Sequence, residues 1–206
     1  MRGKQTALGA ALAALAVLCA MFATSASAAP AWKFEGTALE GTETVVGAAY
    51  ESALTVPGLT TKCENFLYKL TIKNEAGTGK GEVTEVPLYN CTTNSSACTV
   101  KTITAEKLPW PAKLITVSTS SYIVIEGVKV PILYAGKECV LGGLLVTVTG
   151  SAGGIIDNTQ ETATFNSTTL SASKTELKAL GSKIEWSGVF PTEAFQWHRE
   201  QALSVS

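Results

Sequence analysis

The sequence has 206 residues, with 16 lysines and arginines against 17 aspartates and glutamates, and a formal net charge of −1. A weakly acidic chain lacks the surplus of cations that contacts with a phosphate backbone require, so nucleic acid is excluded as a partner. The length is enough to bury a hydrophobic core. No Pro- or Gly-rich linker and no run of like charge divides the chain, so we expect one domain after the N-terminal segment.

The N-terminal segment has the three parts of a secretory signal peptide. Arg2 and Lys4 form a cationic head, an apolar run of alanines and leucines follows, and a tail of small residues ends at Ala28. We predict cleavage between Ala28 and Ala29, which gives a signal peptide over residues 1–28 and a mature domain over 29–206. The mature chain then has 14 basic and 17 acidic side chains and a net charge of −3.

Two other fates for this N-terminal segment are less well supported. An uncleaved membrane anchor needs about 20 apolar residues, and the run is shorter than that. A lipid anchor on Cys19 needs a small residue just before the cysteine, where Leu18 stands. No second long apolar run follows, so we expect no membrane span after cleavage and a secreted or cell-surface protein.

The first strands of the mature chain are predicted over Thr42–Tyr50 and Ala53–Val56, and a hairpin follows them. Residues 66–73 alternate between apolar and mostly polar side chains, which is the period of a half-buried strand. Residues 74–81 contain an asparagine and three glycines and predict a turn, and residues 82–89 return as a second strand.

Four cysteines remain after cleavage, and an even number in an exported chain predicts two disulfides. A structural metal site needs clustered Cys and His pairs, and His198 is the one histidine. If the hairpin turn is centred near Gly77, Lys69 lies opposite Glu85 and Cys63 lies opposite Cys91. The preferred pairing is therefore Cys63–Cys91 with Cys98–Cys139, and a Cys91–Cys98 bridge across a short loop remains the main alternative.

Further short strands are predicted along the rest of the chain, because Thr, Val and Ile are enriched and Gly, Pro, Asn and Ser separate the segments. The predicted ranges are Cys98–Glu106, Leu114–Ser118, Tyr122–Glu126, Val128–Tyr134, Leu144–Thr149, Thr162–Asn166, Leu177–Leu180, Lys183–Phe190 and Ala202–Val205. A short C-terminal helix within Thr192–Leu203 is the one helical option. This pattern predicts an all-β fold, an antiparallel β-sandwich of jelly-roll or Greek-key type, with a closed β-barrel as the alternative.

Five stretches carry a resemblance to known proteins. They read GLTTKC, GTGKGEVT, AEKLPWPAKL, ILYAGKECVLGG and LVTVTGSAGG, beginning at residues 58, 77, 105, 132 and 145. The chain resembles a group of uncharacterised exported β-rich proteins that occur in multiple copies in soil bacteria of the actinobacterial type. The resemblance implies a secreted or cell-surface bacterial protein, and it carries over no catalytic or binding residue.

No catalytic or cofactor motif stands out, so we predict that the protein is not an enzyme and has no cofactor or metal. His198 has no serine motif at a supporting spacing. The run from Gly77 to Gly81 lacks the serine or threonine that follows the lysine in a phosphate-binding loop. Asp157 is the one aspartate, so no common calcium loop is present. Many glutamates remain as candidate carboxylate pairs, but strand glutamates are usually solvated, and a sugar-cleaving sandwich is an analogy of fold alone.

Tryptophans are the remaining candidates for a binding role. Trp110, Trp186 and Trp197 could stack on a sugar or line a partner surface, although core packing is the commoner use of this side chain. We therefore expect a non-catalytic domain with a binding or structural role, whose partner is a polysaccharide of the cell wall or matrix or another protein. A carbohydrate-binding or glycoside-hydrolase-like sandwich and a small-ligand carrier barrel are the alternatives, and the carrier predicts an apolar cavity of several hundred Å³.

Overall fold

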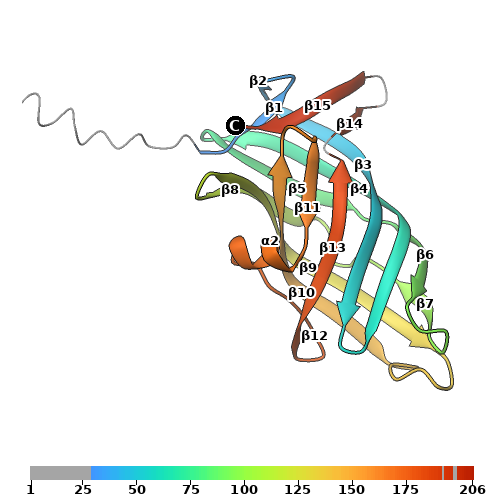
Figure 1. Cartoon of the computed structure of the whole chain (residues 1–206). Coiled ribbons are helices and arrows are strands. Elements are labelled where there is room, and N and C mark those ends of the chain that lie inside the picture. Colours follow the sequence, from blue (N-terminus) through green and yellow to red (C-terminus); the bar gives the residue numbers. More distant parts are fainter. Residues whose placement is uncertain (1–28, 192, 197–198) are drawn as a thin grey trace, which may run out of the picture.

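The computed structural model describes residues 29–191, 193–196 and 199–206, and it consists of strands with one short helix in these residues. Figure 1 shows long strands wound around a common axis, with a small sheet at one end. The elements are β1 (Trp32–Phe34), β2 (Thr37–Ala38), β3 (Thr42–Val56), β4 (Leu59–Glu75), β5 (Thr78–Glu85), β6 (Leu88–Thr93), β7 (Thr99–Ile103), β8 (Trp110–Val117), β9 (Ser120–Ala135), β10 (Leu145–Asp157), β11 (Thr162–Phe165), α2 (Ser167–Ala172), β12 (Leu177–Ala179), β13 (Ser182–Pro191), β14 (Glu193–Gln196) and β15 (Arg199–Val205).

The main sheet closes on itself. Its antiparallel neighbours run β3–β4–β5–β8–β9–β10, and β13 pairs with β3 on the other side. Both β11 and β12 pair with β10 and with β13, which completes the ring. The predicted all-β, antiparallel fold with two disulfides is confirmed. Of the two architectures that the sequence left open, the closed ring of pairings corresponds to the barrel, in which every ring strand has two neighbours.

The strands β11 and β12 occupy one position in the ring, and the helix α2 interrupts them. β11 pairs with the end of β10 near Ile155, and β12 pairs with β10 at Gly150. Asn166 caps the helix: its side chain accepts from the Thr169 backbone N–H, and the Thr169 hydroxyl accepts from the Asn166 backbone N–H. Reciprocal bonds of this kind satisfy backbone donors that a helix start leaves without partners. The helix was not predicted, because a six-residue segment has no apolar periodicity to show.

The predicted hairpin is confirmed. Its turn is Ala76–Gly77, and both residues have positive φ, as a two-residue turn that matches the strand twist requires. From this turn to the Leu70–Val83 pair the register is one residue different from the predicted one. A β-bulge between Lys69 and Leu70, where the Thr84 hydroxyl donates to the Lys69 carbonyl oxygen, shifts the register by one residue. Lys69 therefore lies opposite Glu85, as predicted.

Both predicted disulfides are present. Cys63 of β4 lies directly opposite Cys91 of β6, and their Cα atoms are 4.0 Å apart. Cys98, just before β7, is bonded to Cys139 in the loop between β9 and β10, with Cα atoms 4.8 Å apart. The alternative Cys91–Cys98 bridge is therefore excluded in this structure.

The first two and the last two strands of the described residues form a second sheet, in the order β14–β15–β1–β2, which we call the cap. β14 and β15 occupy the segment for which a short helix was an option, so that expectation is wrong. The physical reason is strand pairing: β14 pairs with β15, and the end of β15 pairs with β1, and these ladders outweigh a weak helical propensity. The predicted strand over Ala202–Val205 is confirmed as part of β15.

Two asparagines fasten the cap to the end of the barrel. The Asn74 side chain accepts from the Trp32 backbone N–H and donates to the carbonyl oxygens of Trp32 and Leu39, at 2.8 to 3.1 Å. The Asn158 side chain accepts from the Val205 backbone N–H and donates to its carbonyl oxygen. Strand ends that would otherwise leave backbone groups without partners are thereby satisfied.

The barrel interior is packed tightly toward the end remote from the cap, which we call the far end. Ile132, Val146 and Leu177 are fully inaccessible there. The hydroxyls of Thr61 and Tyr134 form a buried hydrogen bond of 2.7 Å among these apolar side chains. A buried polar pair that satisfies itself is compatible with a closely packed core.

Glu176 lies between α2 and β12, and its ion pairs link β12 to β13. Its carboxylate lies 2.8 Å from the Lys178 amine of β12 and 3.0 Å from the Lys183 amine of β13. The hydrogen bonds from Lys178 and Lys183 hold the pKa of the Glu176 carboxyl below its ordinary value. A depressed carboxyl pKa stabilises the fold above the unfolded-state pKa, and this stabilisation is lost as the pH falls through the folded-state pKa.

We therefore expect the free energy of unfolding to fall when the pH is lowered from about 5 to 3, in part because Glu176 becomes protonated. When this free energy is measured by urea unfolding across the same pH range, it should change less with pH in Glu176→Gln than in the wild type. The effect should be small and weaken with salt, since both lysines are exposed. Glu138→Gln removes an exposed carboxylate elsewhere and serves as the control. Equal slopes for the wild type and Glu176→Gln would contradict the assignment.

Candidate functional site: an apolar cavity in the barrel

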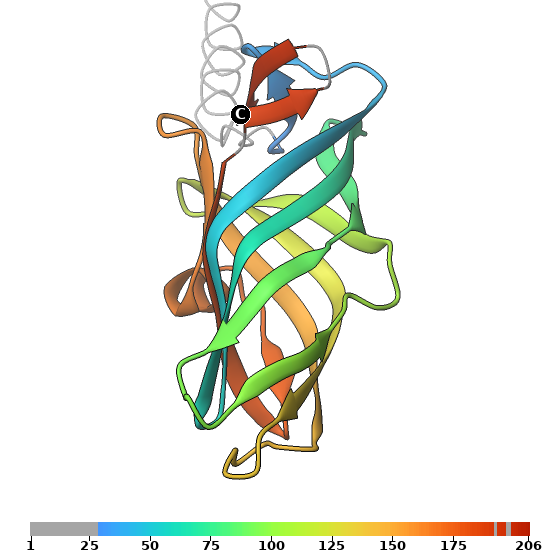
Figure 2. The same ribbon diagram turned by 90° about the vertical axis from the view of Figure 1, so that its right-hand side faces the viewer.

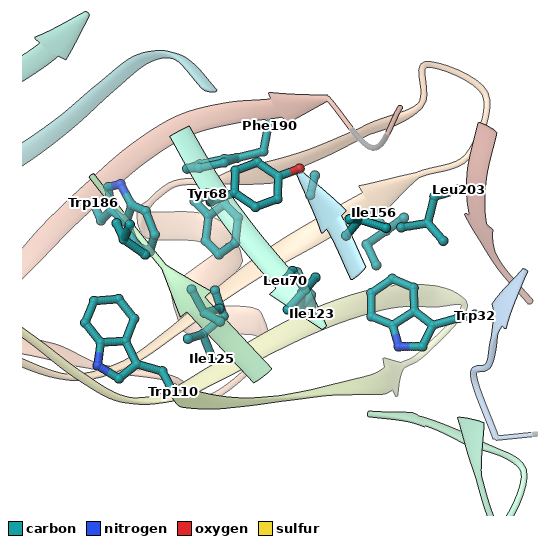
Figure 3. A pocket seen from close by; sticks show the side chains of 15 residues that line it. Trp32, Tyr68, Leu70, Trp110, Ile123, Ile125, Ile156, Trp186, Phe190 and Leu203 are labelled. Atoms are coloured by element: carbon teal, nitrogen blue, oxygen red, sulfur yellow. The ribbon is translucent and has the colours of Figure 1, made fainter. Parts of the chain in front are cut away.

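An apolar cavity of about 70 Å³ lies inside the barrel, between the cap and the packed far end. Figure 3 shows the labelled side chains around this common space. None of the lining side chains is charged. The lining residues are Trp32, Val45, Tyr68, Leu70, Val83, Val86, Trp110, Ile123, Ile125, Ile156, Ala163, Phe165, Trp186, Phe190 and Leu203.

Four aromatic rings form one wall of the cavity. Phe165 stacks on Trp186 with a centroid distance of 4.9 Å, and Phe190 meets both rings edge to face at 5.0 and 5.6 Å. Tyr68 meets Phe190 at 5.7 Å, also edge to face. Offset and edge-to-face arrangements are favourable because the positive edge of one ring meets the negative face of another. The rings therefore fix each other's orientation around the cavity.

Three of these rings lie against glycines of the barrel wall. Tyr68 faces Gly47 across β3 and β4, and Phe165 faces Gly154 across β10 and β11. A Cβ atom at either glycine would overlap the ring opposite it. Gly188 has the same relation to Phe190, two residues further along β13, where a Cβ atom would lie 3.0 Å from the ring. Because glycine has no side chain, each ring can lie close to the wall instead of filling the centre.

The nitrogens of the three lining tryptophans are turned away from any ligand and toward protein oxygens. The Trp32 indole N–H donates to the Lys80 carbonyl oxygen at 3.0 Å. The Trp110 indole N–H donates to the Glu106 carbonyl oxygen at 2.8 Å, and that of Trp186 donates to the Ser52 hydroxyl at 2.9 Å. These bonds satisfy the polar edges of large side chains in an apolar interior. What the tryptophans present to the cavity is ring surface.

Tyr68 carries the hydroxyl group among the lining residues. Burial raises the pKa of this hydroxyl well above its ordinary value of about 10, since the phenolate would lose its hydration. Tyr68 therefore stays neutral over the whole physiological pH range. The cavity as a whole offers no charge to a ligand, and nothing in it activates a nucleophile or transfers a proton near neutral pH.

A second, smaller cavity of about 20 Å³ lies next to the first, toward the far end. Val86, Trp110 and Trp186 line both cavities and separate them. Leu88 of β6 lines the smaller cavity only. The two cavities are therefore adjacent spaces in one apolar interior.

The structure places two of the three tryptophan candidates inside the molecule. Trp110 is 2% exposed and Trp186 is 6% exposed, so neither is available to stack on a sugar at the surface. The two residues, predicted from separate parts of the chain, come together as lining of the same cavity. Trp197 and His198 lie outside the described residues, as do residues 1–28 with the predicted signal peptide.

The residues that build the cavity were largely missed in the sequence, although a signal for them was there. Gly47, Gly154 and Gly188 each stand within a strand, and a glycine inside a strand often marks the close approach of another group. The predicted carrier cavity of several hundred Å³ is also wrong in size, because the aromatic rings occupy much of the barrel interior.

In the described ranges, no group of three or more His, Cys, Asp or Glu side chains is placed to hold a metal ion. No helix of that part of the chain is both long and apolar enough to cross a membrane. No protein family, curated protein or solved structure matches this chain.

Proposed function

We propose that this protein is an exported, non-catalytic binding protein that holds one small, uncharged, apolar ligand inside its barrel. The observation that carries the proposal is the central cavity of about 70 Å³, whose lining has no charged side chain. Protein interiors otherwise contain few voids larger than a water molecule. Export is supported by the features of the first 28 residues and by the two disulfides, which persist in oxidising surroundings.

The energetic argument is that an empty apolar space is unfavourable. At about 24 cal/mol per Å³, an unfilled cavity of this volume costs about 1.7 kcal/mol relative to a filled one. Water recovers little of this cost, because a water molecule needs two to four polar partners. An apolar ligand restores the lost contacts, so a ligand of this class is the natural occupant.

The lining also restricts the chemistry of the ligand. A charged group would lose its hydration without finding a partner, which is strongly unfavourable. The indole N–H groups of Trp32, Trp110 and Trp186 already donate to protein oxygens. A cavity of about 150 Å³ in another protein takes up benzene, so a ligand of ring size requires the rings of Tyr68, Phe165 and Phe190 to move apart slightly.

Binding can be tested with two apolar probes of different size, xenon and fluorobenzene. We expect both probes to bind, and the chemical shifts of ¹²⁹Xe and ¹⁹F report this binding. We also expect saturating fluorobenzene to raise the melting temperature of the protein by mass action. Xenon needs no side chain to move, whereas fluorobenzene needs the rings to separate. Binding of xenon alone would identify the cavity as a packing void and overturn the proposal, as would binding of neither probe.

A matched pair of variants places the probe in this cavity. Gly154→Ala adds a methyl group where the Phe165 ring lies, so the ring must turn away from the wall and into the cavity. We expect this variant to bind fluorobenzene at least tenfold more weakly. The double variant Gly154→Ala with Phe165→Leu removes the overlapping ring and should restore binding. Unchanged affinity in Gly154→Ala would show that the probe binds elsewhere.

A further inference from the structure

An interior ligand needs a route through the barrel, and the two ends offer poor routes. At the far end, Ile132, Val146 and Leu177 are fully inaccessible, so the interior there is closely packed. At the other end, Trp32 and Leu203 of the cap lie over the cavity, and the Asn74 and Asn158 side chains hold the cap strands. Opening the cap would break several hydrogen bonds at once.

The wall between β4 and β9 is built differently in its two halves. Near the cap, β5 pairs with β4, β8 pairs with β9, and Lys80–Val83 of β5 pairs with β8, so the wall is continuous. Toward the far end, β6 pairs with β4 and β7 pairs with β9. In the described part of the chain no backbone hydrogen bond joins β6 to β7. We call this interruption the seam.

A surface groove of about 310 Å³ follows the seam. It lies on the side of the barrel that faces the viewer in Figure 2, where β6 and β7 run from their connecting turn. Leu88 and Cys91 of β6 line one side of the groove, and Val100 to Thr104 line the other. The groove is therefore bounded by two strand edges that belong to different ladders.

Leu88 connects this groove to the interior. This residue lines the surface groove and also the small inner cavity. Val86, Trp110 and Trp186 then lie between the small cavity and the central cavity. The three spaces therefore adjoin one another in this order, with Leu88 at the first boundary, and a leucine side chain can change rotamer without breaking a hydrogen bond.

The two disulfides hold the rims of the seam. Cys63–Cys91 ties β6 to β4, and Cys98–Cys139 ties the start of β7 to the loop after β9. Side-chain motion at the seam therefore need not disturb the strand ladders on either side of it. A side opening requires this arrangement, in which the paired strands stay in place and an apolar side chain between them can move.

We infer that apolar ligands reach the central cavity through the seam between β6 and β7, with the Leu88 side chain as the gate. The inference rests on the proposed function, since it concerns the route to the same site. Leu88 does not line the central cavity, so a change there should alter the rates of binding and release and leave the equilibrium affinity nearly unchanged.

The test measures exchange of fluorobenzene by ¹⁹F NMR in the full chain. We expect Leu88→Ala to raise the association and dissociation rates at least fivefold each, and Leu88→Phe to lower both, with affinities within twofold of the wild type. The control is Asn158→Ala, which loosens the cap and should leave the rates unchanged. A melting curve of each variant checks that it is folded.

Two results would overturn the inference. Rates that do not respond to Leu88 but rise in Asn158→Ala would assign the route to the cap. Rates that respond to neither change would also exclude the seam as the controlling step. Both results differ from failure of the proposed function, in which the wild type itself binds no fluorobenzene.

Discussion

Replacing Trp186 by alanine should lower the free energy of unfolding by about 3–5 kcal/mol, the range expected when a large aromatic side chain is removed from a core. Trp186 is buried between the two cavities, stacks on Phe165 and contacts Phe190 edge to face. Its removal enlarges the empty space and leaves the Ser52 hydroxyl without its indole donor. For a domain of this size the melting temperature should fall by about 10 °C.

Urea unfolding of the wild type and the variant gives this free energy directly. Ser52→Ala is the matched control, because it leaves the indole ring in place and removes only the acceptor of its N–H at 2.9 Å. Loss of this buried hydrogen bond should cost about 1–3 kcal/mol. A loss below 1 kcal/mol for Trp186→Ala would mean that the ring cluster does not organise the core.

Removing the Cys63–Cys91 disulfide should have an effect of similar size. The bridge joins residues 28 apart in sequence, and closing a loop of that length stabilises a fold by about 3.5 kcal/mol, mainly by restricting the unfolded chain. The second bridge, Cys98–Cys139, has a separation of 41, for which the same relation gives about 4 kcal/mol. Loss of both should leave a domain of this size with little stability.

The measurement is the free energy of unfolding in urea for the wild type and two double variants. One double variant carries both Cys63→Ala and Cys91→Ala, and the other carries both Cys98→Ala and Cys139→Ala. Pairwise replacement avoids a free thiol that could form a wrong bridge. Chemical reduction of the wild type provides an independent check, with the thiols counted afterwards. A melting temperature that does not change after complete reduction would contradict a stabilising role for either bridge.

The local features of the fold could be predicted from the sequence, and the physical reason is that they depend on neighbouring residues. Apolar and polar side chains alternate along 66–73, and this pattern places a strand whatever packs against it. The predicted turn position near Gly77 placed Cys63 opposite Cys91, and the structure has this pair. The observed turn at Ala76–Gly77 alone would place Cys63 one residue away from Cys91, and the β-bulge between Lys69 and Leu70 supplies the missing residue. The turn and the alternation could be read from neighbouring residues, and the bulge could not.

The tertiary structure decided the features that depend on distant segments. The sequence left sandwich and barrel open, because the ring closes only where β9 pairs with both β8 and β10. The segment Thr192–Leu203 had a helical option that was lost to strands, since β14 pairs with β15 and the end of β15 pairs with the distant strand β1. Weak intrinsic preferences give way when strand pairing supplies partners for the backbone.

The candidate site belongs to this second group. Tryptophans in a β protein suggested binding, but nothing local tells a surface ring from one that lines a cavity. The outcome depended on which segments meet inside the barrel, because Trp32, Trp110 and Trp186 come from separate parts of the chain and line one cavity. Short-range patterns encode the strands and the hairpin, so these features could be read from the sequence. The closed wall and the apolar space within it depend on contacts between distant segments, such as the pairing of β13 with β3, which no short-range pattern encodes.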